Sequence, residues 1–194
     1  MSGSALKEAG FKEPSIVEAY LMAATSRLIG GYYRKYIESL GLKGDERVLE
    51  YGSGSGAASR YLVRALPNGR LTCVDISRVW MRFAQRAVGR YPNVDFLRGD
   101  LAGLPIEDGS RDGVFIHFVL HDLPQGERAE KVKLLARKLK KGGKVYLREP
   151  TGENHGMPAA EIRAIMAGAG LAEINSGTGK SPEGWPTFQA VYEK

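Results

Sequence analysis

The hydrophobic positions of this chain follow a helical pattern first and then alternate between strand-like and helix-like spacing. From Ser15 to Leu40 apolar residues recur three and four positions apart, which predicts two helices interrupted at Gly30-Gly31. Beyond them, short apolar runs typical of buried strands alternate with stretches of helical spacing. We expect strands over residues 47–50, 70–75, 94–98, 112–118 and 144–148, and helices over 54–65, 77–89, 125–140 and 157–168.

This alternation predicts an α/β fold with a doubly wound, mostly parallel sheet, because helices of this length join parallel strands. The last two expected strands, 171–176 and 187–192, are separated only by a loop rich in Gly, Pro and Ser. Two strands without a crossover helix run antiparallel as a hairpin. We therefore expect a seven-stranded sheet that ends in an antiparallel hairpin. Residues 1–43 would form an arm and cap helices, and 44–194 the ligand-binding part of one compact domain.

Composition and charge add limits to this picture. The 194 residues, 43% of them hydrophobic, fit one globular domain. Residues Met1 to Glu13 are polar and lack the apolar centre of a signal peptide, so we expect a frayed or tag-like arm. The single cysteine, Cys73, lies in an apolar run, which favours a buried thiol and a cytoplasmic protein. The net charge of +6 fits a solvated basic surface or an anionic partner such as a lipid headgroup.

Three glycines directly follow the first expected strand. Gly52, Gly54 and Gly56 would let a ligand approach the backbone closely and would present amide groups at a helix N-terminus. On their own they also fit a dinucleotide-binding loop or, less well, a tight turn that serves only packing.

Three acidic residues narrow the choice of ligand. Glu50, Asp75 and Asp100 each stand at or just beyond the carboxyl end of one of the first three strands, so they converge on one crevice. A carboxylate beside the loop repels a pyrophosphate and attracts an ammonium or sulfonium group. Asp75 can accept hydrogen bonds from ribose hydroxyls, and Asp100 from an adenine amino group with Leu101 against the ring. The pattern favours a cationic adenosyl ligand.

These motifs resemble the class I S-adenosylmethionine-dependent methyltransferases, from about Gly44 to the C-terminus. The matching segments occur in the family's order: 48–56, 74–77, 99–105, 112–117 and 139–144. The resemblance implies a Rossmann-like fold with S-adenosyl-L-methionine as cofactor and S-adenosyl-L-homocysteine as product. The cofactor-binding residues it implies, together with those inferred above, are Tyr32, Glu50, Tyr51, Gly52, Ser53, Gly54, Gly56, Asp75, Ile76, Asp100, Leu101, His117 and Phe118.

Segments 100–105 and 117–122 are similar to the quinone-biosynthesis and sterol-type members of this family. The similarity implies a small-molecule or lipid-like acceptor that is methylated on O, N, S or C. Methyl transfer requires alignment, exclusion of water and, for some acceptors, removal of a proton. His117 or His121 could serve as the base; alternatively His121 caps the following helix and His117 packs beside the adenosine. No third group completes a metal site with them, so we expect no metal.

Other residues are expected at the acceptor pocket. Arg148 and Glu149, at the end of the fifth strand, could hold a polar acceptor together with His121, or could pair with each other. Tyr20 and Tyr33 could cover the cofactor and shape the pocket, or could belong to the core.

Several alternatives remain open for the function. An NAD-dependent oxidoreductase fits the glycine loop but not the acidic residues or the terminal hairpin. An RNA or protein methyltransferase fits the net charge, although the segment from His117 to His121 lacks the Asn/Asp-Pro-Pro-aromatic motif of base-methylating enzymes. A non-catalytic binder of S-adenosylmethionine is the third alternative. We expect a monomer or homodimer that could contact a membrane surface.

Overall fold

A mixed β-sheet forms the centre of the computed structural model, which describes residues 12–153 and 155–194. Its strands run in the order β3-β2-β1-β4-β5-β8-β7, with β6 paired to β5 beside this path. Strands β1 to β5 are parallel along this path, and β8 runs antiparallel to both β5 and β7. The expected mostly parallel sheet with a terminal hairpin is confirmed. The strand bounds are β1 Arg47–Tyr51, β2 Arg70–Asp75, β3 Val94–Arg98, β4 Arg111–His117, β5 Leu139–Gly152, β6 His155–Gly156, β7 Ala172–Lys180 and β8 Pro186–Glu193.

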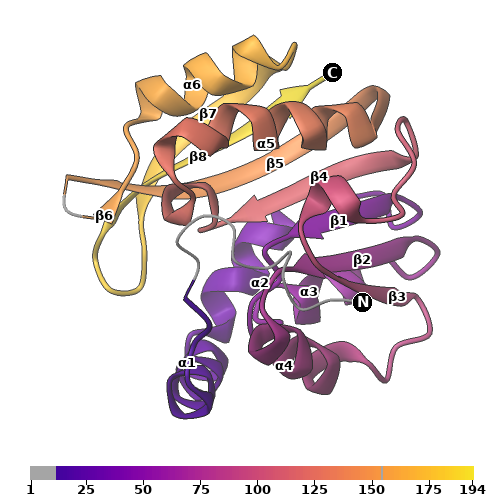
Figure 1. Cartoon of the computed structure of the whole chain (residues 1–194), viewed down its shortest axis with the longest axis vertical. Coiled ribbons are helices and arrows are strands. Elements are labelled where there is room, and N and C mark those ends of the chain that lie inside the picture. The colour runs from indigo at the N-terminus through magenta and orange to yellow at the C-terminus, as the bar shows by residue number, and fades with distance from the viewer. Residues whose placement is uncertain (1–11, 154) are drawn as a thin grey trace.

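Helices cover both faces of this sheet (Figure 1). Side chains alternate between the two faces along each strand. In β4, for example, Val114 and Ile116 pack into the core beneath α5 and α6, whereas Phe115 packs with residues of α2 and α3. The helix bounds are α1 Ile16–Leu28, α2 Gly30–Glu38, α3 Ser59–Ala65, α4 Arg78–Val88, α5 Gln125–Lys138 and α6 Ala159–Gly168.

Local sequence explains where several helices begin. Ser15 and Glu18 form a capping box at the start of α1. The Ser77 hydroxyl accepts a hydrogen bond from the Trp80 amide at the start of α4. The first two helices meet at Ile29, so the glycine pair begins α2 instead of forming the break.

Three elements differ from the expectation. The helix expected from Gly54 begins only at Ser59, because Gly54 and Gly56 have φ angles of +51° and +76°, which a right-handed helix cannot contain. Strand β5 extends well beyond the expected 144–148, with an irregular register against β4 near its start. Strand β7 continues to Lys180, so the expected loop before β8 is shorter.

The N-terminal helices pack against the rest of the chain. Tyr36 and Ile37 of α2 are buried in the core on the face covered by α2, α3 and α4. Ahead of α1, the Glu13 carboxylate accepts hydrogen bonds from the Ser77 hydroxyl and the Val79 amide, both at 2.6 Å. Most of the expected N-terminal arm, residues 1–11, lies outside the described residues.

Candidate functional site

A cavity of ≈ 1120 Å³ opens at the carboxyl ends of the parallel strands. This edge is where α/β sheets of this kind bind ligands. The wall is built from β1, β2 and β4, from the turns that follow β1, β3 and β4, and from α1, α2, α4 and α5. Twelve of the expected site residues line it: Tyr33, Glu50, Tyr51, Gly52, Ser53, Gly54, Asp75, Ile76, Asp100, Leu101, His117 and Phe118.

The glycine loop presents bare backbone to this cavity. The amides of Gly52 and Ser53 donate to the Val74 carbonyl at 2.9 and 3.0 Å, which fixes the loop beside β2. A Cβ atom at Gly54 would meet no atom within 4 Å. Gly56 does not line the cavity, and its Cβ would lie 2.9 Å from the Ala87 side chain. Gly56 therefore serves the packing of the loop against α4, not the direct ligand contact expected for it.

Glu50 is a fully enclosed carboxyl group at the base of the loop. It is 2% exposed and accepts hydrogen bonds from the Ser59 hydroxyl at 2.5 Å and the Cys73 thiol at 3.4 Å. Burial raises its pKa to about 7, although these two hydrogen bonds oppose the shift. A cationic ligand group beside it would favour the ionised form.

Asp75 shapes the loop as well as lining the cavity. Its two carboxylate oxygens accept hydrogen bonds from the amides of Gly54 and Ser77, each at 2.8 Å. Burial raises the pKa of Asp75 to about 6 against the effect of these bonds. Each oxygen has a second lone pair, so the carboxylate can accept ligand hydroxyls without releasing the loop.

Asp100 is paired with a residue that the sequence analysis did not identify. Its carboxylate accepts hydrogen bonds from the Lys131 ammonium at 2.5 Å and from the Ala102 amide at 2.8 Å. Burial would raise the pKa of Asp100, but these bonds outweigh it and the pKa is lowered. Lys131 lies on α5 and also lines the cavity. The pair keeps an ionised carboxylate at this end of the site.

His117 forms part of the cavity wall inside a group of aromatic rings. Its ring centroid lies 4.4 Å from that of Phe118 and 5.3 Å from that of Tyr33. Burial, and then the charge of Arg148, lowers the pKa of His117 to about 3. The imidazole is therefore neutral at physiological pH and a weak base, which does not support the expected role as proton acceptor.

His121 and Glu149 instead organise the turn after β4. Phe118 has a φ angle of 58°, rare for a bulky residue, and the turn beyond it aims two amides at Glu149. Oxygen Oε1 of Glu149 accepts from the amides of Val119 and Leu120, each at 2.8 Å, and Oε2 lies 2.7 Å from His121 Nδ1. Neither His121 nor Glu149 lines the cavity. The expectation that both contact the acceptor is therefore not supported.

Arg148 points to the opposite face of the sheet from Glu149. Its guanidinium donates two hydrogen bonds to the Gln189 side chain and lies 3.6 Å from the centre of the Tyr36 ring. The alternative of an Arg148–Glu149 ion pair is therefore wrong, because successive residues of a strand face opposite sides. Arg148 does not itself line the large cavity.

Two tyrosines expected at the site have different positions. Tyr20 is 67% exposed and lies outside the cavity, with its ring edge-on to Phe83, so its position does not support the expected acceptor contact. The buried Tyr32 hydroxyl has no hydrogen-bond partner among the described residues, and its ring packs edge-on to His117.

Helices contribute several of the wall residues that the sequence analysis missed. Met22 of α1 and Trp80 of α4 line the cavity, as do Pro124, Glu127 and Lys131 at the start of α5. The spacing of the last three residues, three and four apart, indicates a shared helix face. That spacing alone does not show which way the face points. The remaining missed wall residues are Ser55, Ala57, Ala58, Gly99, Phe115, Val119, Asp122 and Leu123.

Two absences concern residues 12–153 and 155–194, the part of the chain that the structure describes. None of the helices there has both the length and the apolar character needed to cross a membrane. Within the same ranges, no three His, Cys, Asp or Glu side chains are grouped so that they could hold a metal ion.

Comparison with known proteins gives consistent matches. A family model described as a methyltransferase domain matches residues 48–143. A phthiotriol/phenolphthiotriol dimycocerosates methyltransferase of Mycobacterium ulcerans is 33% identical over 132 residues, which are 67% of this chain and 46% of that protein. A demethylmenaquinone methyltransferase of Renibacterium salmoninarum is 29% identical over 116 residues, 60% of this chain and 46% of the relative. The chain thus spans about half the length of these two relatives.

A solved structure supports the same fold. A SAM-dependent methyltransferase from Aquifex aeolicus superimposes with a TM-score of 0.73 at 20% identity. The match covers 92% of this chain and 99% of that one, so the similarity includes the cap helices or the terminal hairpin as well as the central sheet.

Proposed function

This chain belongs to the class I S-adenosylmethionine-dependent methyltransferase family, and on that premise we propose that it methylates a small-molecule or lipid-like acceptor in the cavity above β1, β2 and β4. One observation carries the proposal. A glycine loop with exposed backbone and three carboxyl groups, Glu50, Asp75 and Asp100, surround a single cavity. An anionic dinucleotide would place its phosphates on the loop beside the Glu50 carboxyl group, whereas the cationic end of an adenosyl ligand complements that group.

The residues present fit S-adenosyl-L-methionine. Glu50 would meet the ammonium group beside the bare backbone of Gly54, and the buried Ser53 hydroxyl, which has no partner among the described residues, lies in the same loop. Asp75 would accept the ribose hydroxyls, and Asp100 with Leu101 would bind the adenine. When bound, the cofactor supplies a methyl group on a sulfonium centre, ready for attack by a nucleophile.

The protein's own contribution is mainly alignment and exclusion of water. The rings of Tyr33, Phe115 and Phe118 form an apolar wall, and Met22 adds to it from α1. His117 stays neutral there and offers a hydrogen bond to the acceptor. We propose that His121 acts indirectly, because it holds the turn beyond Phe118 in place through Glu149.

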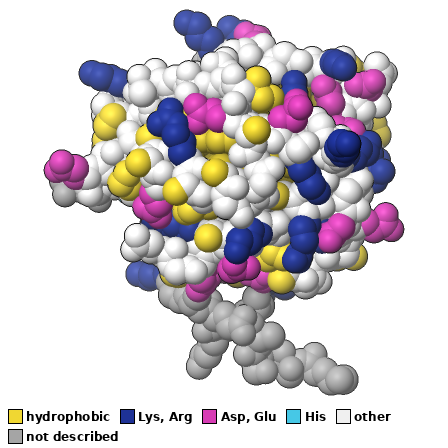
Figure 2. Space-filling view, turned by 90° about the horizontal axis from the view of Figure 1, so that it is seen from above, with side chains coloured by type: hydrophobic (Ala, Val, Ile, Leu, Met, Phe, Trp, Pro, Cys, Tyr) yellow, Lys and Arg dark blue, Asp and Glu magenta, His cyan; other side chains and the backbone are white. Residues whose placement is uncertain are grey.

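The names of the two relatives support an acceptor of the lipid or small-molecule type. Figure 2 shows a face on which basic and acidic side chains are interspersed. A surface that binds nucleic acid typically carries a continuous patch of basic side chains, and this face has none. This arrangement supports the lipid-like acceptor over RNA.

We further propose a cytoplasmic protein that meets its acceptor at a membrane surface. The buried thiol of Cys73 supports a reducing compartment. An apolar face of α1 supports the membrane contact. Residues 1–43 would then act as a cap on a cofactor-binding part that begins at residue 44. We propose a monomer or a homodimer.

The test is a methyl-transfer screen with isotope-labelled S-adenosylmethionine and a panel of phenols, quinols, amines, thiols and lipid dispersions. Titration calorimetry with S-adenosylmethionine and with NAD is run in parallel. We expect cofactor binding in the micromolar range and label in one acceptor class. Binding of NAD instead would identify an oxidoreductase, and cofactor binding without transfer to any class would favour a silent binder.

A further inference from the structure

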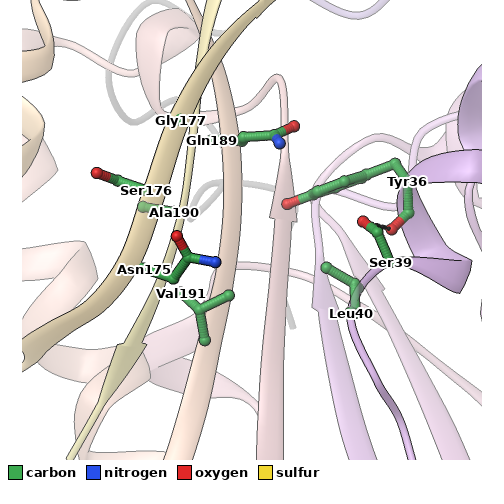
Figure 3. A pocket seen from close by; sticks show the side chains of 9 residues that line it. All are labelled: Tyr36, Ser39, Leu40, Asn175, Ser176, Gly177, Gln189, Ala190 and Val191. Carbon is green, nitrogen blue, oxygen red and sulfur yellow. Dashed lines mark hydrogen bonds between the residues drawn. The ribbon is translucent and has the colours of Figure 1, made fainter.

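A row of polar side chains crosses three adjacent strands on the face covered by α2. In the sheet register, His117 of β4 is opposite Arg148 of β5, and Arg148 is opposite Gln189 of β8. Opposite residues on neighbouring strands project from the same face. Tyr32 and Tyr36 of α2 close the row from above: the Arg148 guanidinium carbon lies 4.7 and 3.6 Å from the centres of their rings. Figure 3 shows Gln189 and Tyr36 pointing toward each other across this face.

Arg148 is a buried cation without an acidic partner. Its side chain belongs to a residue only 9% exposed, and its two donated hydrogen bonds go to the neutral amide of Gln189. The described residues form no ion pair with it within 4.0 Å; even Glu183, whose charge acts on Tyr32 and Tyr33, is not paired with it. Burying an uncompensated charge is costly, so such groups normally meet an anion.

Three polar atoms of this cluster have no partner in ordinary hydrogen-bond geometry, although the Arg148 guanidinium and the Tyr32 hydroxyl are close enough to attract each other. They are Nη1 of Arg148, the hydroxyl of Tyr32 and Nε2 of His117, all of them buried. The centres of the Tyr32 and His117 rings are 6.1 Å apart, and His117 lines the large cavity. A guanidinium N–H and a phenolic O–H can both donate to one oxygen atom, and so can a neutral imidazole in the tautomer that carries its proton on Nε2. Of the three residues only His117 lines the cavity, and Tyr32 and Arg148 lie directly behind it, so an acceptor that reached them would have to pass the His117 ring.

We propose that the acceptor carries an anionic oxygen on a flat ring system, and that Arg148, Tyr32 and His117 bind this oxygen. The inference rests on the proposed methyl transfer and specifies its substrate class. The anion is either a carboxylate or an acidic hydroxyl ionised as an enolate or phenolate. The aromatic rings of Tyr33, His117 and Phe118 provide the flat surroundings for the ring. A neutral imidazole at His117 can donate to such an oxygen and places no second positive charge beside Arg148.

The test measures the binding of three probes of similar shape to the full chain saturated with S-adenosylhomocysteine. The probes are 2-naphthoate for the carboxylate, 2-hydroxy-1,4-naphthoquinone for the ionised hydroxyl, and 2-naphthamide as the neutral control. We expect at least one anion to bind about tenfold or more tightly than the amide, as for a hydrogen bond to a charged group. The anion that binds more tightly identifies the source of the charge.

Variants test whether the preference for the anionic probes depends on this cluster. Arg148→Gln should abolish it, and Tyr32→Phe, which removes only one hydroxyl group, should reduce it several-fold. Arg163→Gln is the matched control, because Arg163 also lies over an aromatic ring, that of Phe188, but belongs to α6 and does not line the cavity. It should retain the preference. Thermal melting and the affinity for S-adenosylhomocysteine show that each variant is folded. If Arg148→Gln does not fold, Tyr32→Phe alone decides.

Each other outcome has a defined meaning. Equal binding of all three probes, or of none by a protein that binds S-adenosylhomocysteine, would overturn the inference. It would also be overturned if Arg148→Gln kept the preference and lost affinity for S-adenosylhomocysteine, since Arg148 would then serve the cofactor carboxylate. Failure of the wild-type chain to bind S-adenosylhomocysteine would contradict the proposed function itself.

Discussion

At the scale of single residues, the buried carboxyl group of Glu50 should make cofactor binding dependent on pH. Its pKa is about 7 in the free protein, and a bound ammonium group would lower it. Binding below pH 7 must therefore displace a proton, so the affinity for S-adenosylmethionine should fall by up to about tenfold per pH unit below 7 and level off above it. Titration calorimetry between pH 5.5 and 7.5, in buffers of different ionisation enthalpy, measures both the affinity and the released proton.

Substitution tests whether Glu50, and not another acidic residue, causes this pH dependence. We expect Glu50→Gln to lose about 10- to 100-fold in affinity at pH 7.5, the value of a hydrogen bond to a charged group, and to release fewer protons on binding. Asp95→Asn is the control, because Asp95 pairs with Arg70 at the surface and lies outside the cavity. An unchanged pH profile in Glu50→Gln would assign the proton to another group, with Asp75 the first to examine.

The buried pair of Glu149 and His121 predicts an effect on stability. Glu149 is fully buried and accepts from the backbone of the turn after β4 as well as from His121. Replacing it by Gln leaves at least one of these donors without its charged acceptor, so we expect a loss of about 3 kcal/mol in the free energy of unfolding. Glu173→Gln, which removes a partly exposed pair with Arg163, should cost about 1 kcal/mol or less. Urea denaturation of both variants checks this difference.

The same pair predicts the direction in which the stability of the protein changes with pH. Burial lowers the pKa of His121, but the hydrogen bond and charge of Glu149 outweigh it, so the pKa is raised above 6.5. A group whose pKa is raised by folding stabilises the protein fully below its unfolded pKa, and this stability is lost as the pH rises through the folded pKa. The stability advantage of wild type over His121→Gln should therefore be larger at pH 6 than at pH 8.5. An equal advantage at both values would show that His121 does not titrate in this range.

At the scale of elements, two glycines of one loop have different roles that substitution can separate. Gly54→Ala places a methyl group in open cavity space, so only the left-handed backbone opposes it, at about 1–2 kcal/mol. Gly56→Ala adds a collision with Ala84 and Ala87 of α4 and should cost about 2 kcal/mol more.

Affinity should follow the opposite order. Gly54→Ala should weaken S-adenosylmethionine binding by about tenfold, because the backbone can no longer approach the ligand closely. Thermal melting and calorimetry on the two variants measure stability and affinity separately. If Gly56→Ala were the more damaging variant for affinity and the less damaging for stability, the assignment of the two glycines would be reversed.

Patterns among residues close in the chain predict most of the helices and strands. Where the prediction fails, the failure also has a physical cause. The strand–helix alternation predicts the parallel sheet, and the missing helix before β8 predicts the hairpin, because both depend on residues close in the chain. The start of α3 was placed five residues too early, since helical spacing does not reveal the positive φ angles at Gly54 and Gly56. The strand β6 has only two residues and pairs with a neighbouring part of β5, so no periodicity marks it.

At the scale of the whole molecule, the contribution of each helix to the site could not be predicted. Tyr20 and Met22 stand two positions apart on α1, yet only Met22 lines the cavity. Likewise, Trp80 and Lys131 reach the same wall from α4 and α5, which cover opposite faces of the sheet. The rotation of a helix about its axis is fixed by packing between elements distant in sequence, and a single sequence contains no direct record of that packing.

The outer face of α1 gives the whole molecule a candidate contact with lipid. Ile16, Val17, Tyr20, Leu21 and Leu28 are 62–88% exposed, and at 100° per residue they lie within about 140° of the helix circumference. On the same scale Arg27 falls inside this arc, and its charge acts on Arg60 as that of Arg64 does, so basic groups accompany the apolar side chains. Apolar side chains flanked by cations are typical of helices that lie on anionic bilayers.

This arrangement predicts binding to anionic vesicles but weak binding to neutral ones. In co-sedimentation, Leu28→Ser should reduce the affinity for vesicles containing phosphatidylglycerol by about tenfold, from the apolar burial it removes. Ile174→Ser is the matched control, because Ile174 is also exposed but lies on β7 at the far edge of the sheet. Equal losses in the two variants would show that α1 is not the contact. Since Met22 of the same helix lines the cavity, an acceptor held in the bilayer under α1 would have a direct apolar route to the methyl-transfer site.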